Sequence, residues 1–145
     1  EIRQSLLVRK GDETKYTDFA SLSGRTVGVQ SETTGADYAK AEGAKANVQV
    51  KEYTGADELF TALEAKQIDG VVQDFPVNQY NAETTGDTVV SKTFDSAPEF
   101  YGFVIPKKST ELLEAVDKGL AELKADGDYD AILKEYEVED GAVKS

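Results

Sequence analysis

The chain has 145 residues, a formal net charge of -12 at pH 7, 30% charged and 39% hydrophobic residues, and neither cysteine nor histidine. This length and balance predict a globular domain, and acidity spread along the chain excludes nucleic acid as a partner, which would need a clustered Lys/Arg surface. The missing residue types exclude disulfides, thiolate metal sites, the usual zinc sets and histidine-based triads.

Taken in order, the segments alternate between patterns typical of strands and patterns typical of helices. Strands are expected at 5–9, 25–30, 47–53, 71–74, 87–95 and 100–104. Helices are expected at 17–24, 34–42, 54–67, 75–83, 109–127 and 129–136. This order predicts an α/β fold with a largely parallel sheet. Since the chain begins at Glu1 with no signal peptide, we expect a processed or truncated N-terminus.

The helix expected at 109–127 has the most regular apolar pattern of the chain. Its apolar stripe consists of Leu112, Leu113, Val116, Leu120 and Leu123. Its opposite face carries Glu111, Glu114, Asp117 and Glu122, which we interpret as solvated surface. The stripe must be covered, either by folding onto the rest of this chain or by a second chain.

Hydroxyl residues follow the strand expected at 25–30, where the next helix begins. Ser31, Thr33 and Thr34 lie at this point. A helix N-terminus presents unpaired N–H groups and a partial positive charge, so the segment is suited to a carboxylate or phosphate. The same residue types are also the usual helix N-caps, and the local pattern leaves both readings open.

A carboxylate, Asp74, ends the strand expected at 71–74 and precedes Phe75 and Pro76. It is a candidate for holding an ammonium group, and equally a candidate N-cap of the next helix. In open α/β sheets ligands bind at the carboxyl ends of the strands. One place for a negative group and one for a positive group at the same sheet edge would suit a zwitterion such as a free amino acid.

Other chemistry is weakly supported. The chain has no P-loop and no GxGxxG motif, no metal-ligand spacing and no sign of a cofactor. Four aromatic residues fall at spacings typical of packing, namely Phe19, Tyr38, Phe60 and Tyr80.

Three stretches resemble, in order and spacing, the polar amino-acid substrate-binding proteins of ABC importers, family 3, which have the type II periplasmic-binding fold. They are "YTDFASLSGRTVGVQSETTGADYAK", "ELFTALEAKQIDGVVQDFPV" and "FYGFVIPKKSTELLEAVDKGLAELKADGDYDAILKEY". The resemblance runs from about Leu6 to Tyr136. It implies a Rossmann-like three-layer lobe, with no cofactor and no catalytic residue.

Proteins of this family have two lobes, and the resemblance implies that this chain holds the second. Residues 12–97 would be the ligand-binding second lobe. Residues 1–11 and 98–145 would hold the hinge strands and the C-terminal helices that belong to the first lobe in full-length relatives. The N-terminal part of the first lobe would then be absent, and with it the family's arginine clamp and aromatic wall.

The family's site residues carry over by position. Thr34, with the backbone around Thr33, matches the group that binds the ligand α-carboxylate, and Asp74 matches the carboxylate that pairs with the α-ammonium. Glu32 departs from the family, which usually has glycine there. It either points to solvent or faces a basic ligand side chain.

The resemblance implies a periplasmic or extracellular receptor that is lipid-anchored in some full-length forms. Its expected partners are a free amino acid, the membrane subunits of an ABC permease, and a first lobe or a second copy of this chain in a domain-swapped dimer. With half a cleft, we expect weak binding or none. Two alternatives stay open: an enzyme of the cyclohexadienyl dehydratase type on the same fold, and the ligand-binding lobe of a sensor or receptor ectodomain.

Overall fold

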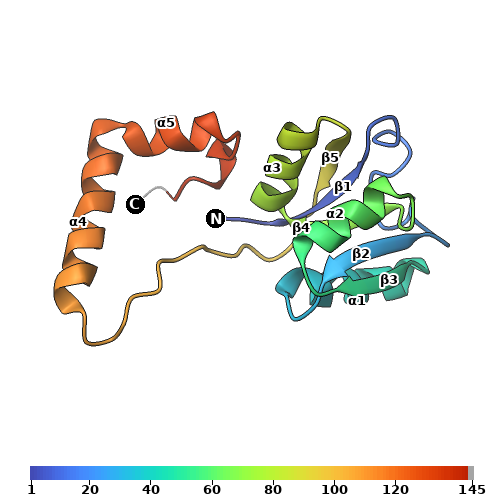
Figure 1. The fold of residues 1–145 in the computed structure, drawn as a ribbon, viewed down its shortest axis with the longest axis horizontal. Coiled ribbons are helices and arrows are strands. Elements are labelled where there is room, and N and C mark those ends of the chain that lie inside the picture. The colour runs from blue at the N-terminus through green and yellow to red at the C-terminus, as the bar shows by residue number, and fades with distance from the viewer. Residues whose placement is uncertain (144–145) are drawn as a thin grey trace. The chain divides into compact units, whose positions relative to one another are not determined.

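The computed structural model describes residues 1–143 and divides the chain into two compact units (Figure 1). The first comprises Ile2–Pro98 and the second comprises Glu99–Ser145 with Glu1. The strands are β1 (Gln4–Arg9), β2 (Thr26–Gln30), β3 (Gln49–Tyr53), β4 (Gly70–Asp74) and β5 (Thr88–Thr93). The helices are α1 (Thr34–Ala46), α2 (Ala56–Glu64), α3 (Phe75–Thr85), α4 (Thr110–Asp126), α5 (Asp128–Glu135) and the short 3-10 helix η1 (Glu139–Gly141).

The unit of residues 2–98 is built on one five-stranded sheet with the order β3-β2-β4-β1-β5. Strand β2 pairs in parallel with both β3 and β4, and β1 pairs antiparallel with both β4 and β5. Four strands therefore run in one direction and β1 runs against them. This confirms the predicted α/β fold with a largely parallel sheet.

Helices cover both faces of this sheet, which gives the predicted three layers (Figure 1). On the face of the sheet that α1 covers, Leu6 and Val8 of β1 belong to one buried cluster. Leu7 belongs to a second cluster, on the face that α2 covers. Adjacent residues of β1 face opposite ways because side chains alternate along a strand. Helix α3 packs against β1, β4 and β5.

Two glycines allow the helices to approach the sheet closely. A Cβ on Gly28 of β2 would lie 2.6 Å from Ile68 Cδ1 and 2.7 Å from Leu59 Cδ2, so both side chains would have to shift to admit a larger residue. Gly43, expected to end α1, lies inside it instead, where a Cβ would lie 3.2 Å from Val50 Cγ2. The helix continues to Ala46 and ends at Asn47, whose φ of 58° is left-handed.

The helix expected at 17–24 is wrong, because this segment forms turns. The side chain of Ser21 accepts from the backbone N–H groups of Thr17 and Asp18, and Asp18 Oδ1 accepts from Ser21 N. Such short-range bonds compete with helical ones. Tyr16, Phe19 and Leu22 are still buried in the core.

Strand β1 was expected as a hinge strand within residues 1–11. The structure places it inside the sheet of residues 2–98, between β4 and β5, with Leu6, Leu7 and Val8 fully buried. It therefore contributes a central strand to this unit.

The unit that follows Pro98 contains α4, α5 and η1, and the strand expected at 100–104 does not form. Phe100 and Val104 are exposed, the latter completely. A strand needs a neighbour to satisfy its backbone groups, and in this unit of the described chain no strand is present to pair with it. The expected apolar stripe of α4 is largely open, with Leu112, Leu113 and Leu123 exposed.

Candidate functional site

The N-terminus of α1 lies at the carboxyl end of β2, as the sequence predicts. Thr33 is the N-cap, and its Oγ1 accepts a hydrogen bond of 3.1 Å from Ala36 N. The same hydroxyl donates to Gln30 O over 2.8 Å, and the Ser31 hydroxyl donates to Tyr53 O over 3.1 Å. Since each hydroxyl has one hydrogen, those of Ser31 and Thr33 are committed to the protein. Donors for an anion would then come from Thr34 or from the backbone of the first turn.

Thr34 is the first residue of α1, and its side chain is exposed. The first N–H groups of a helix have no partner within the helix and carry its partial positive charge. Gly35 and Ala36 behind it are buried, and Ala36 N and Asp37 N donate to Thr33. The start of this turn, at Thr34 and Gly35, is therefore the part that suits a carboxylate.

Glu32 makes the turn between β2 and α1. Its φ of 60° lies in the left-handed region, which costs any residue with a Cβ roughly 1–2 kcal/mol. This conformation explains why glycine suits the position, and the Glu32 side chain is exposed.

Asp74 is the last residue of β4 and the N-cap position of α3, yet its side chain makes no capping hydrogen bond. The capping interpretation of this carboxylate is therefore wrong for the side chain. Its Oδ1 instead accepts a hydrogen bond of 2.7 Å from Nε2 of Gln4. Gln4 is directly opposite Asp74 in the antiparallel pair of β1 and β4.

Glutamine side chains connect the two predicted parts of the site. Gln73 Nε2 donates to Gln30 Oε1 over 3.2 Å, and Gln73 Oε1 accepts from Asp74 N over 3.2 Å. Gln4, which donates to Asp74, also contacts α1. The contact is close, since a Cβ added to Gly35 would lie only 2.6 Å from Gln4 Oε1. We call this ring of contacts the edge network; its members are Thr33, Gln30, Gln73, Asp74, Gln4 and Gly35.

The edge network brings the hydroxyl segment and Asp74 together at one edge of the sheet. Sequence reasoning predicted Thr33, Thr34 and Asp74 but missed Gln4, Gln30 and Gln73. The available signal was a glutamine at the start of one strand with an apolar centre and at or next to the end of two others.

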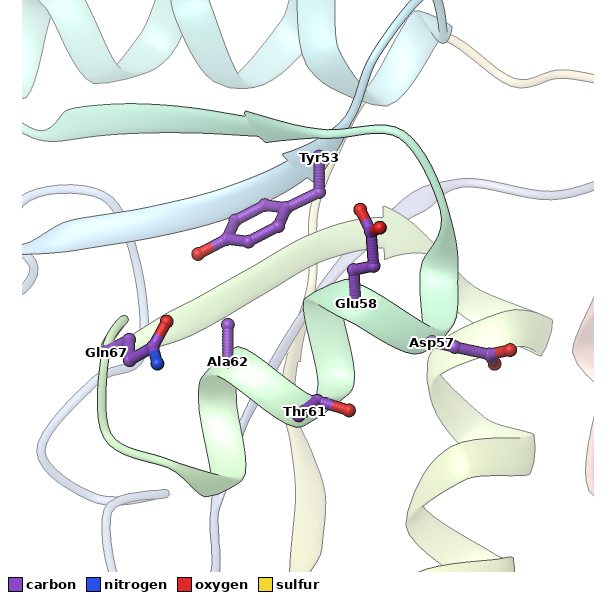
Figure 2. Close-up of a pocket in the computed structure, with 6 residues that line it drawn as sticks. All are labelled: Tyr53, Asp57, Glu58, Thr61, Ala62 and Gln67. Atoms are coloured by element: carbon purple, nitrogen blue, oxygen red, sulfur yellow. The ribbon is translucent and has the colours of Figure 1, made fainter.

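A shallow pocket of about 460 Å³ lies between the end of β3 and α2, away from these residues (Figure 2). It is lined by Tyr53, Asp57, Glu58, Thr61, Ala62 and Gln67. The Glu58 carboxylate in it already accepts hydrogen bonds from the backbone and hydroxyl of Thr54. The pocket contains no member of the edge network, and we do not assign it a ligand.

The predicted packing of the four aromatic residues is confirmed for three of them. Phe19, Tyr38 and Phe94 form a mutual cluster with ring centroids 5.0–5.9 Å apart, which confirms packing for Phe19 and Tyr38. Burial raises the pKa of the Tyr38 hydroxyl, with smaller contributions from the charges of Glu42 and Asp95. Phe60 packs against the α2-side core, as predicted, whereas Tyr80 is 60% exposed and its predicted packing is wrong.

In the part of the chain that the structure describes, we find neither a cluster of metal-ligating residues nor a helix that could span a membrane. Within residues 1–143, no three carboxylates gather as metal ligands would. Over the same residues, each helix is too short or too polar to cross a bilayer.

Comparison with known proteins decides the family. Residues 4–139 match the model of bacterial extracellular solute-binding proteins, family 3. The chain belongs to this family. Family 3 members similar to it include the histidine-binding periplasmic protein of Salmonella typhimurium, 30% identical over 141 residues, which cover 90% of this chain and 53% of that protein. The glutamine-binding protein GlnH of Bacillus subtilis is 29% identical over 143 residues, which cover 98% of this chain and 50% of GlnH.

Solved structures agree with this assignment. An ancestral arginine-binding protein bound to arginine superposes with a TM-score of 0.72 at 31% identity, over 94% of this chain and 60% of that one. An ancestral amino acid-binding protein described as a precursor of cyclohexadienyl dehydratase gives a TM-score of 0.73 at 30% identity, over 93% of this chain and 57% of that one. This family 3 chain thus spans about half the length of the curated relatives it matches.

Proposed function

We propose that this chain forms one wall of an amino-acid-binding cleft in the extracytoplasmic receptor of an ABC importer. The observation that carries the proposal is the edge network, which holds a helix N-terminus and a carboxylate at the same sheet edge. The names of the relatives, which bind histidine, glutamine or arginine, support a polar amino acid as ligand.

The carboxylate end of the ligand would bind the first turn of α1. Backbone N–H groups around Thr34 and Gly35 would donate to it, because the Thr33 hydroxyl is already used within the protein. Thr33 then serves the site by capping α1 and fixing the direction of that first turn.

The ammonium end would bind Asp74. A carboxylate has about four lone-pair positions, so the bond from Gln4 leaves room for a charged donor. For a ligand with a basic side chain, we propose that Glu32 supplies a further charge, since it stands exposed beside the first turn of α1.

The lobe would comprise residues 12–97 together with β1, which the structure places in the same sheet. The second wall of the cleft would come from a first lobe or from a second copy of this chain. Either would also cover the open apolar face of α4 and α5. The remaining partners would be permease membrane subunits, and the location would be periplasmic or extracellular, with a lipid anchor in some full-length forms.

NMR titration of the 145-residue chain with each of the twenty amino acids tests this function. We expect shifts at residues of the edge network and dissociation constants on the order of a millimolar or weaker, because half a cleft encloses the ligand poorly. Sub-micromolar affinity would contradict the half-site. The mass in solution separates the two candidate covers: a strictly monomeric, well-ordered chain would exclude the second copy.

A second candidate, an enzyme on the same fold, is favoured by the likeness to the dehydratase precursor. Of the residues that the structure describes at this edge of the sheet, Glu32 and Asp74 are the two that we propose could transfer protons. Turnover of a cyclic acid that disappears in Asp74→Ala would support it, whereas amino-acid binding without turnover supports the receptor.

A further inference from the structure

We infer that Gln4 is a positioning residue for the Asp74 carboxylate and that ammonium recognition at this edge depends on it. The inference rests on the proposed function for its ligand, and on the edge network for its geometry.

Hydrogen bonds of the backbone fix the position of Gln4. Its N–H donates to Ser96 Oγ over 3.0 Å, and its carbonyl accepts from Phe94 N over 2.9 Å. The residue is 1% exposed. Because its backbone is held in this way, the Gln4 side chain can hold a partner in one orientation.

The side chain of Gln4 spans the gap between β4 and α1. Its Nε2 donates to Asp74 Oδ1, and its Oε1 lies against the backbone of Gly35, where a Cβ would clash. An amide buried there needs hydrogen bonds that an apolar side chain of the same shape would not need. Packing alone therefore does not explain glutamine at this position, whereas orienting a carboxylate does.

If Gln4 did not donate to it, the Asp74 carboxylate could instead accept a hydrogen bond from the first turn of α3. Aspartate is a favoured N-cap, and Asp74 occupies the N-cap position of α3 without capping it. N-cap side chains accept from the second or third helical N–H, and Pro76 has none, which leaves that of Val77. The bond from Gln4 holds the carboxylate away from this capping position.

The decisive experiment compares L-arginine with des-amino arginine, which lacks only the α-ammonium, by NMR titration of the full chain. Gln4→Met keeps the length and volume of the side chain and removes its donor. We expect its affinity for L-arginine to fall about tenfold, typical of a lost hydrogen bond to a charged group, with affinity for des-amino arginine unchanged. Gln49→Met, an exposed glutamine of β3, is the matched control and should change neither. Equal losses for both ligands would overturn the inference.

A measurement without ligand separates this inference from the proposed function. In Gln4→Met the Asp74 carboxylate no longer accepts from Gln4 and should cap α3, so the Val77 amide should shift downfield and exchange more slowly. An unchanged Val77 amide overturns the inference, whatever the chain binds. If Val77 responds but the wild type binds no amino acid, the proposed function is what fails. Gln4→Asn, whose amide is one methylene too short to reach, should reproduce both effects if Gln4→Met does not fold.

Discussion

The side-chain amide of Gln73 donates a hydrogen bond over 3.2 Å to the side-chain oxygen of Gln30, and this bond joins the ends of β4 and β2. The Gln30 carbonyl accepts the Thr33 hydroxyl, and Gln73 Oε1 accepts the Asp74 N–H. Both ends of the proposed site are therefore tied to one another without ligand, which reduces the ordering cost of binding.

Thr33→Val should remove the cap of α1 and lower the free energy of unfolding by about 1 kcal/mol. The reason is that the side-chain acceptor of Ala36 N is lost while the size of the side chain is kept. Urea unfolding measures the change. Thr14→Val, an exposed threonine outside the helices, is the control, and an equal effect of the two variants would mean that the cap adds nothing.

Asp74→Asn should weaken L-arginine binding by roughly tenfold or more and leave des-amino arginine unaffected. The variant removes the charge but keeps an oxygen that can accept from Gln4 Nε2. Titration with the two ligands measures the ratio of affinities. An unchanged ratio would show that the ammonium binds elsewhere.

Glu32→Gly should stabilise the chain by about 1 kcal/mol, because glycine adopts a φ of 60° without the Cβ conflict that Glu32 carries. Glu32→Ala retains a Cβ and should show no comparable gain, which makes it the matched control. Thermal unfolding of the three chains compares them. If alanine stabilises as much as glycine, backbone strain is not the cause.

Gly35→Ala should reduce L-arginine affinity several-fold while changing the free energy of unfolding by less than about 1 kcal/mol. The new Cβ would displace the end of the Gln4 side chain, which is flexible enough to move but would then leave Asp74. Gly119→Ala in α4, where no heavy atom lies within 4 Å of an added Cβ, is the control and should leave affinity unchanged. Binding equal to the wild type in Gly35→Ala would argue against the contact with Gln4.

The sequence allowed the sheet, its helical layers and both ends of the candidate site to be predicted, because the strand and helix patterns around Thr33 and Asp74 are local. The connection between these ends could not be predicted. It depends on Gln4, which meets Asp74 seventy positions away only once β1 has paired with β4. The segment 100–104 failed for a similar reason, because a strand forms only beside a neighbour and its unit of the described chain has none. The segment 17–24 failed for a local reason, because side-chain bonds of Ser21 override the helical pattern.

The helices that follow Pro98 differ from the sheet in what holds them. Of the residues described in α4 and α5, none is buried. Isolated helices shorter than about 12–15 residues are marginal in water, and α5 has 8 residues. In the 17-residue α4, Gly119 lowers the helix propensity. Hydrogen exchange should therefore be fast along α4 and slow along β1, whose Leu6, Leu7 and Val8 are fully buried. Equal protection of both would contradict this. A partner that covers α4 would complete the folding of this segment as it binds, so assembly and folding of the C-terminal third would be one event.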